Sequence, residues 1–519
     1  MPKRKREQKP AAAVPLKSAL KSSKIPRTDP EPLTTKPAST HSISKVPKEQ
    51  DGIASAQTKK ATTRCSLQLV TGSYERILHG FTATFATNTS NHTADASDSQ
   101  TSFSDTFLFA AHASSIRSLA VSQPNQAGKR VLATGSSDER VNLYQLSTSA
   151  PMEGEDPLAS SSSLLGSSIS ENPRNRELGS LLHHARTVTR LSFPTKSKLF
   201  SAAEDNTIAI TRVRDWTMLS SIKAPVPKQH GRPSGDTAAP GEVPAGVNDF
   251  AIHPSMKLMI SVGKGERCMR LWNLVTGKKA GVLNFDRALL AQAGEGKYGT
   301  GEGRQVVWSN DGERFVVLFE WGAVVYDMGS EPVSVIRSLP ATKLHHARFV
   351  PTHDKDVHIL AVSTENGRVM FFDLDRHRDT AASGEPDAEK KLPMCECVAQ
   401  IESATLSSAG RIKDFELFEV PSSPDSFDMV FVTASSDGAV RLWAIDSAAL
   451  VKSKDDPPAK AGAPPKQVGT LLGVRETGNR LTCMTGFVMD DSAEADEPEE
   501  VAPPGGLDVT SDSSNSDDE

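Results

Sequence analysis

The sequence has few aromatic residues, few cysteines and no long apolar run. The last two shortages each exclude a class of protein. Phe, Trp and Tyr together make up 5% of the 519 residues. No stretch approaches the roughly 18 apolar residues of a membrane-spanning helix, so we expect no integral membrane protein. The five cysteines are too scattered for a disulfide framework, and the N-terminus has no apolar segment typical of a secretory signal. These features predict a protein of a reducing, intracellular compartment.

The hydrophobic content is also low, and charge is distributed unevenly along the chain. Hydrophobic residues amount to 37%, against roughly 45–50% in a typical globular domain. Residues 1–64 carry 15 Lys and Arg but 5 Asp and Glu, whereas residues 490–519 carry 12 acidic and no basic residues. Segments with so little apolar surface cannot offset the entropy lost on ordering. We therefore predict a disordered basic tail (1–64), a folded body (65–489) and a disordered acidic tail (490–519).

Both tails carry short motifs with a candidate function. A compact cationic cluster, which predicts a nuclear-import signal, is formed by Lys3, Arg4, Lys5 and Arg6. A nucleic-acid-binding arm and a merely solvated basic terminus are the alternatives. In the acidic tail, Ser514 and Ser516 each have an acidic residue three positions later, a spacing that resembles the sites of acidophilic kinases. Phosphorylation there would add negative charge, and a plain solubilising tail is the alternative.

A self-similar unit recurs through residues 65–489 and determines the predicted fold. Each copy has an apolar run, a tight polar turn with an acidic residue or Asn, and a second run that usually closes on an aromatic residue. The clearest copies are VLATGSSDERVNLYQL (131–146) and VFVTASSDGAVRLWAI (430–445). β-Branched and aromatic residues around such a turn are typical of two antiparallel strands. With the short strands expected between copies, each unit has four strands, which is typical of a WD40-type β-propeller blade.

Seven copies can be recognised, and their spacing predicts the number of blades. The closing positions recur about every 60 residues, whereas a WD40 unit needs about 40–45. Without the surplus, which we interpret as loop insertions, about 41 residues remain per unit. RLTCMTGFV (480–488) is expected to supply the inner strand that the first copy (67–82) lacks. The candidate insertions are 88–104, 147–178, 224–246, 286–303, 376–393, 421–427 and 447–466.

The sequence therefore predicts an all-β fold. It is a seven-bladed WD40 β-propeller closed by its N- and C-terminal strands, with disordered tails and long loop insertions. Closing the ring in this way removes sheet edges that would otherwise be exposed.

Residues that stabilise the blades can be assigned from their positions in the repeats. In WD40 blades, a His before the inner strand often forms a hydrogen bond with the Asp of the tight turn. Such buried polar groups need partners, so we interpret these histidines as structural rather than as metal ligands or bases. The expected structural residues are His112, Asp138, His184, Asp205, Trp272, Asp437 and Trp443.

No motif in the folded body predicts catalysis or a bound cofactor. Gly294, Gly296 and Gly299 satisfy G-x-G-x-x-G, but a strand rather than a helix is expected after them, so we interpret this segment as a flexible loop. Cys395 and Cys397 have no second cysteine pair and no His at zinc spacing. No phosphate-binding loop and no nucleophile elbow is present. We therefore expect no enzyme activity, no cofactor and no metal site.

Basic residues stand at the start of several predicted inner strands. In a WD40 propeller, these positions share one face with the tight turns, which here carry acids such as Glu75 and Asp437. We interpret them as a candidate basic rim that contacts RNA phosphates or an acidic partner. Pairing with the turn acids inside the protein is the alternative. The candidate rim consists of Arg186, Arg304, Lys343, Arg411 and Arg480.

Taken together, the repeats resemble a known family. LVTGSYERILHGF (69–81), HPSMKLMISVGKGERCMRLWNLVTGK (253–278) and TASSDGAVRLW (433–443) are similar to the PAK-interacting WD-repeat family. That family includes fungal nuclear factors for assembly of the large ribosomal subunit. The resemblance covers essentially all of 65–489 outside the insertions. The sequence departs from WD40 habit because it lacks a Trp-Asp dipeptide and has Thr211 at an aromatic position.

The resemblance implies a non-catalytic scaffold in the nuclear biogenesis of the large (60S) ribosomal subunit. The implied location is the nucleus and nucleolus, and the implied partners are pre-60S proteins and precursor rRNA. An adaptor that binds and negatively regulates a PAK-type kinase is the alternative from the same family. A propeller enzyme or substrate-recognition subunit is a third reading, which would need a polar pocket or a degron-binding surface. We expect a monomer within a large assembly and no membrane binding.

Overall fold

The computed structural model describes most of the predicted folded body. The described residues are 64–87, 101–126, 128–148, 175–227, 245–352, 354, 357–378, 391–402, 410–420, 428–451 and 465–489, and they belong to one compact unit, Ala61–Glu519. The import candidates Lys3 to Arg6 and the candidate phosphosites Ser514 and Ser516 lie outside these residues.

The described secondary structure is almost entirely β-strand, which confirms the predicted all-β class. The exceptions are the helix α1 (Arg287–Gln292) and the 3₁₀ turn η6 (Ser447–Ala449). Neither has the length and apolar character needed to cross a membrane, and no other helix occurs among the described residues.

Three of the sheets are antiparallel four-stranded meanders that follow one another along the chain. The first consists of β4 (Ile116–Val121), β5 (Lys129–Ser136), β6 (Val141–Ser147) and β7 (Arg176–Leu181). The second consists of β8 (Val188–Thr195), β9 (Lys198–Ala203), β10 (Thr207–Arg212) and β11 (Met218–Lys223). The third consists of β12 (Val247–Ile252), β13 (Leu258–Gly263), β14 (Cys268–Asn273) and β15 (Lys278–Asn284).

A nine-stranded sheet follows, and it contains two further four-stranded meanders. One parallel pair, Val335 with Met394, joins their outer strands. The first meander is β16 (Gln305–Trp308), β17 (Arg314–Leu318), β18 (Gly322–Asp327) and β19 (Pro332–Arg337). The second is β20 (Leu344–Val350), β21 (Ile359–Thr364), β22 (Val369–Arg378) and β23 (Met394–Ile401), to which β27 (Lys466–Gln467) adds in parallel.

The last two sheets contain the end of the described chain, and one of them also contains its beginning. One sheet consists of β24 (Ile412–Glu419), β25 (Met429–Ser435), β26 (Ala439–Ile445) and β28 (Thr470–Glu476). The other has the order β29-β1-β2-β3, with β29 (Leu481–Val488), β1 (Arg64–Ser73), β2 (Ile77–Ala86) and β3 (Ser102–Ala110). β29 pairs antiparallel with β1, so that Thr485 lies opposite Val70. This confirms the predicted sharing of one sheet by both ends, although β1 starts at Arg64, one residue before the expected boundary.

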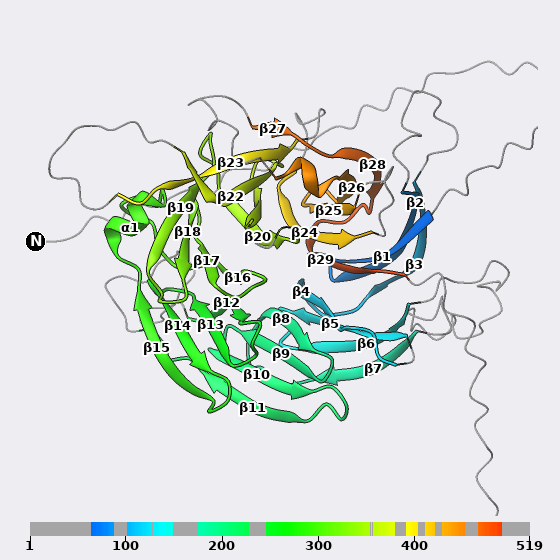
Figure 1. Ribbon diagram of the computed structural model, residues 1–519. Helices are drawn as coiled ribbons and strands as arrows, with labels where there is room; N and C mark the ends of the chain where they lie inside the picture. The colour runs from blue at the N-terminus through cyan, green and yellow to red at the C-terminus, as the bar shows by residue number, and fades with distance from the viewer. Residues whose placement is uncertain are drawn as a thin grey trace, which may run out of the picture. The chain divides into compact units, whose positions relative to one another are not determined.

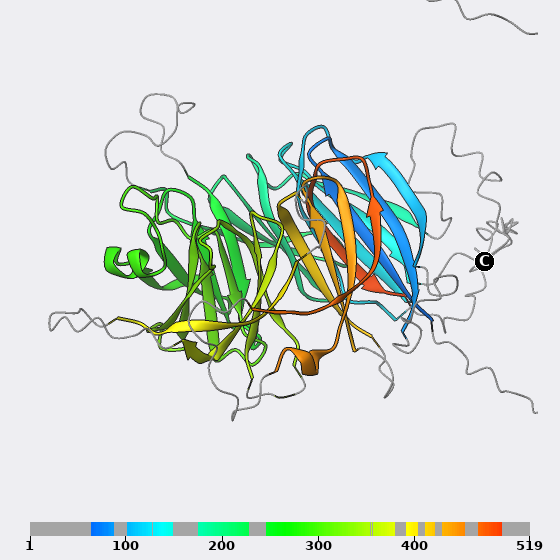
Figure 2. The ribbon, with the colours of Figure 1, turned by 90° about the horizontal axis from the view of Figure 1, so that it is seen from above.

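The inner strands of these sheets form a closed circle. β4, β8, β12, β16, β20 and β24 each contact the next, and β29 contacts both β24 and β4. Figure 1 shows the sheets arranged around a centre, and Figure 2 shows the same unit from above, with α1 at its outer side in both views. The arrangement is consistent with a β-propeller.

The hydrophobic core is divided among the spaces between adjacent sheets. Apolar residues of the described chain form seven clusters, and each combines side chains from two neighbouring four-stranded units. One cluster, for example, packs Leu69 and Phe81 of the closing sheet against Val432 of β25. Strands such as β25 are buried along their whole length because both faces meet a neighbouring sheet. Outer strands such as β11 are mostly exposed, including the apolar side chains of Met218 and Leu219.

The tight turns between second and third strands need a left-handed residue, and the sequence supplies one. Arg76, Glu139, Asn206 and Gly438 all have positive φ, of 72°, 71°, 61° and 93°. At Gly438 a Cβ atom would come within 2.7 Å of the Asn479 carbonyl oxygen, so glycine is required there for space as well as for conformation.

The predicted insertion 286–303 lies between β15 and β16, outside both meanders, but the expectation of a flexible loop there is wrong. This segment begins with α1 and buries Leu290 and Ala293 against the sheet that contains β17 and β18. Arg267 binds it by donating to the carbonyls of Thr300 (2.7 Å) and Gly299 (3.0 Å). The glycine-rich loop expected to be flexible is therefore packed against the body. The other six candidate insertions lie wholly or partly outside the described residues.

Candidate interaction surface and central channel

His112 and Asp138 lie together at the start of β4, as expected from the repeat. Nδ1 of His112 lies 3.0 Å from Asp138 Oδ2, and its Nε2 lies 2.8 Å from the Thr134 hydroxyl. Asp138 also accepts from the Ala113 amide at 2.9 Å. Burial lowers the pKa of His112, although the nearby Asp138 carboxylate opposes that shift. The network ties the segment before β4 to the turn between β5 and β6.

His184 and Asp205 repeat this arrangement one sheet further on. Nδ1 of His184 lies 3.3 Å from Asp205 Oδ2, and its Nε2 lies 2.7 Å from the Ser201 hydroxyl. Burial acts to raise the pKa of Asp205, but hydrogen bonds from His184, Thr207 and the Ala185 amide hold it well below its usual range. Thr211, at the position of the usual aromatic residue, is buried, and its hydroxyl has no hydrogen-bond partner among the described residues.

The remaining predicted blade residues make different contacts. Trp272 donates from Nε1 to the Ser261 hydroxyl at 2.8 Å. Asp437 accepts from the Gly410 amide and pairs with Arg441, where the sheets of β4 and β8 use a His. Trp443 is buried, but its Nε1 has no hydrogen-bond partner within the described part of the chain.

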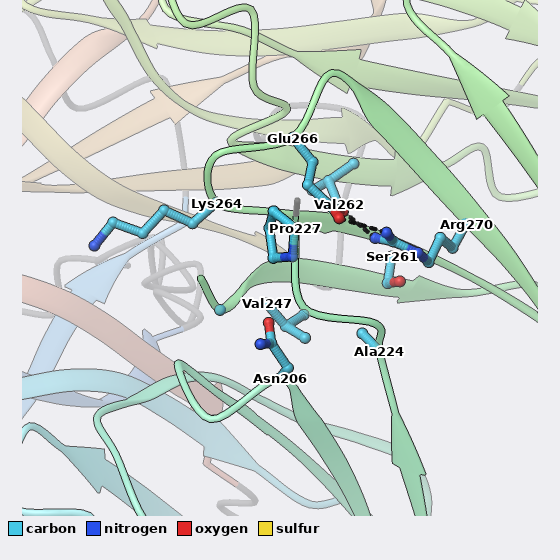
Figure 3. A pocket seen from close by; sticks show the side chains of 11 residues that line it. Asn206, Ala224, Pro227, Val247, Ser261, Val262, Lys264, Glu266 and Arg270 are labelled. Carbon is cyan, nitrogen blue, oxygen red and sulfur yellow. Dashed lines mark hydrogen bonds and ion pairs between the residues drawn. The ribbon is translucent and has the colours of Figure 1, made fainter. Parts of the chain in front are cut away.

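A small hollow lies between the sheet of β8–β11 and the sheet of β12–β15. Figure 3 shows the ion pair between Glu266 and Arg270 at its edge, with Asn206 of the β9–β10 turn and Val247 of β12 also lining it. Lys264 at its rim reaches Glu204 of the adjacent sheet at 3.4 Å. The hollow has no room for a water-sized molecule. The residues around it therefore connect two sheets, and the hollow does not hold a ligand.

Two residues of the predicted basic rim share one turn carboxylate. Arg304 lies directly before β16 and Lys343 directly before β20. Glu320, in the turn between β17 and β18, pairs with both, at 3.2 Å from Arg304 and 2.8 Å from Lys343. The hydrogen bond from Lys343 lowers the pKa of Glu320. The Lys343 ammonium also lies 5.6 Å from the centre of the Trp321 ring.

Arg411, directly before β24, pairs with a second turn carboxylate. Its guanidinium lies 3.2 Å from Glu365 Oε1, and His345 Nε2 lies 2.5 Å from Glu365 Oε2. Burial acts to raise the pKa of Glu365, but His345, Arg411 and the nearby Lys413 lower it. Pairing with turn acids, the alternative interpretation of the rim, therefore describes Arg304, Lys343 and Arg411.

Lys413 is a further cation at this position that sequence reasoning missed. It is the second residue of β24, is half-buried, and forms no ion pair with any described residue. Burial lowers the pKa of its ammonium group, and the charges of Arg411, Arg480 and Arg304 lower it further, whereas the Glu365 carboxylate opposes the shift. The only available signal was its strand position in RIKDFELF, which did not reveal its neighbours.

Arg480 lies at the join between the two ends of the chain. Its backbone amide donates to Glu75 at 3.0 Å, and its carbonyl accepts from the Tyr74 amide at 2.8 Å. Its guanidinium lies 5.5 Å from the centre of the Tyr74 ring, and the Tyr74 residue is 57% exposed. No ion pair involves its side chain among the described residues, unlike the other predicted rim residues before β16, β20 and β24.

These groups form what we call the turn-face cluster. It stands at the starts of β16, β20, β24 and β29, which follow one another around the circle of inner strands. Arg186, near the start of β8, is left out because β12 separates β8 from β16. The cluster comprises the cations Arg304, Lys343, Arg411, Lys413 and Arg480, the carboxylates Glu75, Glu320 and Glu365, and the rings of Tyr74 and Trp321.

Polar side chains join the inner strands to one another around the central channel. Each side chain bonds across one junction to the next strand, which fixes the spacing of the circle. The bonds are Ser118 to the Leu191 amide, Thr189 to the Val247 carbonyl, Asp249 to the Val306 amide, Gln305 to both backbone groups of Ala347, Arg348 to Glu416, Asp414 to the Met484 amide, and Thr482 to the Ile116 carbonyl.

The channel itself holds a cavity of about 570 Å³ lined by residues of all seven inner strands. One part of its wall is the pair Arg348–Glu416, in which two guanidinium nitrogens contact both carboxylate oxygens. Burial raises the pKa of Glu416 to about 7, against the opposing charge of Arg348. No group of three or more His, Cys, Asp or Glu side chains in the described residues is placed to hold a metal.

The fold and its networks are those of a protein of the β-propeller type, and its described residues carry a set of cations on the turn face. No family model matches the chain. It is 25% identical over 432 residues to "p21-activated protein kinase-interacting protein 1-like" of Danio rerio, covering 83% of each chain. It is 26% identical over 413 residues to "Protein MAK11" of Saccharomyces cerevisiae, covering 76% of each.

A further relative is "Shk1 kinase-binding protein 15" of Schizosaccharomyces pombe, with 22% identity over 311 residues, 59% of this chain and 63% of the relative. These homologues confirm the predicted resemblance to the PAK-interacting family. Most of their names describe interacting or binding proteins rather than enzymes.

Proposed function

We propose that the chain is a non-catalytic WD-repeat scaffold in nuclear assembly of the large (60S) ribosomal subunit. We count the nine-stranded sheet as two blades, which makes residues 65–489 a seven-bladed WD40 propeller between tails 1–64 and 490–519. Seven inner strands in a closed circle and seven core clusters support this count. Rigid propellers suit scaffolding because they present loops at fixed positions to partners.

The observation that carries the proposal is the turn-face cluster. It has five cations against three carboxylates on one continuous surface, so paired groups leave a positive excess. A pre-60S particle presents RNA phosphates and basic proteins. The negative RNA phosphates complement the positive excess of the turn-face cluster. The resemblance to fungal factors for large-subunit assembly, together with the similarity to MAK11, supports the same assignment. In this proposal the partners are pre-60S proteins and precursor rRNA, and the cluster of Lys3 to Arg6 directs import to the nucleus and nucleolus.

A kinase adaptor is the second candidate, because names of relatives describe binding to p21-activated kinase and to Shk1 kinase. In this alternative the chain binds a PAK-type kinase and restrains it. The two functions differ in the partners that the protein binds in the cell.

Affinity purification of the tagged protein, followed by mass spectrometry and RNA sequencing, separates the candidates. Large-subunit assembly proteins with precursor rRNA are expected. A kinase recovered without ribosomal precursors would replace the scaffold proposal with the adaptor.

A further inference from the structure

The turn-face cluster combines two features that a simple salt-bridge network does not need. The first is an excess of positive charge: Lys413 and Arg480 form no ion pair with any described residue, and Lys413 sits half-buried beside Arg411 with only the more distant Glu365 carboxylate opposing the nearby cations. The depressed pKa of Lys413 reflects burial and this excess of positive charge. An anion placed there would relieve the repulsion among the cations.

The second feature is the presence of aromatic rings beside the cations. The Arg480 guanidinium lies 5.5 Å from the centre of the Tyr74 ring, and the Lys343 ammonium lies 5.6 Å from the centre of the Trp321 ring. Tyr74 is 57% exposed and belongs to none of the seven core clusters. Exposed aromatic and guanidinium planes are the surfaces on which unstacked bases bind.

From these observations we infer that the turn-face cluster binds single-stranded RNA, with phosphates at Arg411, Lys413 and Arg480 and a base stacked at Tyr74. An acidic protein segment would satisfy the cations but would make no use of the rings. The cations also follow four consecutive strand starts, which suits a chain of regularly spaced phosphates better than one acidic side chain. The inference deepens the proposed function by naming the chemistry of the partner and the residues that meet it.

Fluorescence anisotropy with the purified full chain and a labelled 20-nucleotide single-stranded RNA tests the inference. The variants are Arg411→Gln/Arg480→Gln, Lys413→Gln and Tyr74→Ala. Lys196→Gln/Lys278→Gln is the matched control, because both lysines are exposed and lie elsewhere on the ring. The basic tail is present in every protein compared, so its contribution cancels in the differences. Melting curves verify that each variant is folded.

The expected results differ between the two kinds of residue. Each lost phosphate contact lowers the slope of log affinity against log salt by about 0.7, so the double variant loses about 1.4 and Lys413→Gln about 0.7. Tyr74→Ala weakens binding roughly fivefold or more at unchanged slope, because stacking on one base is worth about 1–3 kcal/mol. The control stays within about twofold of the wild type.

Two results overturn the inference. Cluster variants that bind RNA like the control would show that the turn-face cluster does not bind RNA. Equal affinity for single-stranded RNA and its duplex, with no effect of Tyr74→Ala, would show that unstacked bases are not recognised. The proposed function is judged separately by the affinity purification. RNA binding through the cluster without ribosomal precursors in the cell would contradict the scaffold role alone.

Discussion

The guanidinium of Arg480 lies 5.5 Å from the centre of the Tyr74 ring, and the Tyr74 amide donates to the Arg480 carbonyl at 2.8 Å. The two residues are 406 positions apart in the sequence. Arg480 directly precedes β29 and Tyr74 directly follows β1, so this contact lies where the two ends of the chain meet. Ring closure and the turn-face cluster therefore share residues.

Deletion of residues 480–489 should destabilise the protein severely. It removes β29 together with the buried side chains of Leu481, Met484 and Phe487, and exposes the edge of β1. We expect insolubility, or a melting temperature lower by roughly 10 °C or more. Deletion of 490–519, which leaves every described residue in place, is the control and should melt like the intact chain. Equal melting of all three proteins would contradict closure by β29.

His358 should stabilise the fold in a pH-dependent way. Its Nδ1 lies 3.1 Å from Asp375 and its Nε2 lies 2.9 Å from Asp311, which joins the meanders of β16–β19 and β20–β23. The hydrogen bond to Asp375, supported by Asp311, raises the pKa of His358 to about 9. A raised pKa stabilises the folded state fully below the unfolded value near 6.5, and the effect is lost as the pH rises through 9.

Thermal melting of His358→Gln at several pH values measures this effect. The difference from the wild type should be largest near pH 6, should shrink above pH 7 and should nearly vanish at pH 10. His377→Gln, an exposed histidine in β22, is the control and should show no such trend. A His358→Gln difference that is constant from pH 6 to 10 would show that packing, not charge, is responsible.

Arg348 and Glu416 should be strongly coupled across the junction between β20 and β24. Arg348→Met leaves the Glu416 carboxylate, 13% exposed, without its charged partner. We expect a loss of roughly 3 kcal/mol in the free energy of unfolding at pH 8, since breaking a buried pair costs more than removing it. Arg348→Met/Glu416→Gln should recover at least half of that loss in urea denaturation. The single variant Glu416→Gln completes the comparison. If the losses in unfolding free energy of Arg348→Met and Glu416→Gln simply added up in the double variant, a direct coupling would be excluded.

Replacement of Lys3, Arg4, Lys5 and Arg6 by Ala should change location and not stability. Four charges are removed from a segment outside the described residues, so purified protein should melt like the wild type. A fluorescent fusion should shift from the nucleus toward the cytoplasm. Unchanged nuclear accumulation would assign import to another segment or to a bound partner.

The strands could be predicted from sequence because alternation, β-branched residues and turn chemistry act locally. The copy at 430–445, for example, became β25 and β26 with Asp437 and Gly438 in the turn. The link of β19 to β23 could not be predicted, because one pair, Val335 with Met394, leaves no periodic pattern. α1 was missed for a similar reason: six residues are too few to establish a helical period.

Part of the candidate site was likewise accessible from sequence. Position before an inner strand identified Arg304, Lys343, Arg411 and Arg480, because the repeat fixes which face those positions share. Burial and mutual distance depend on the packing of separate sheets, so the exposed ring of Tyr74 and the half-buried ammonium of Lys413 were not identified. The repeat also gave no reason to separate Arg186 from the other cations, whereas the circular order of strands does.

Sedimentation of the tagged protein through a sucrose gradient, beside Arg411→Gln/Arg480→Gln, tests the central claim most directly. The wild type should co-sediment with pre-60S particles that contain precursor rRNA, and the double variant should shift toward the free protein while melting normally. Wild-type protein found only in free fractions would contradict the assignment to large-subunit assembly. A folded double variant that stays fully with the particles would show that the turn-face cluster does not hold the protein there.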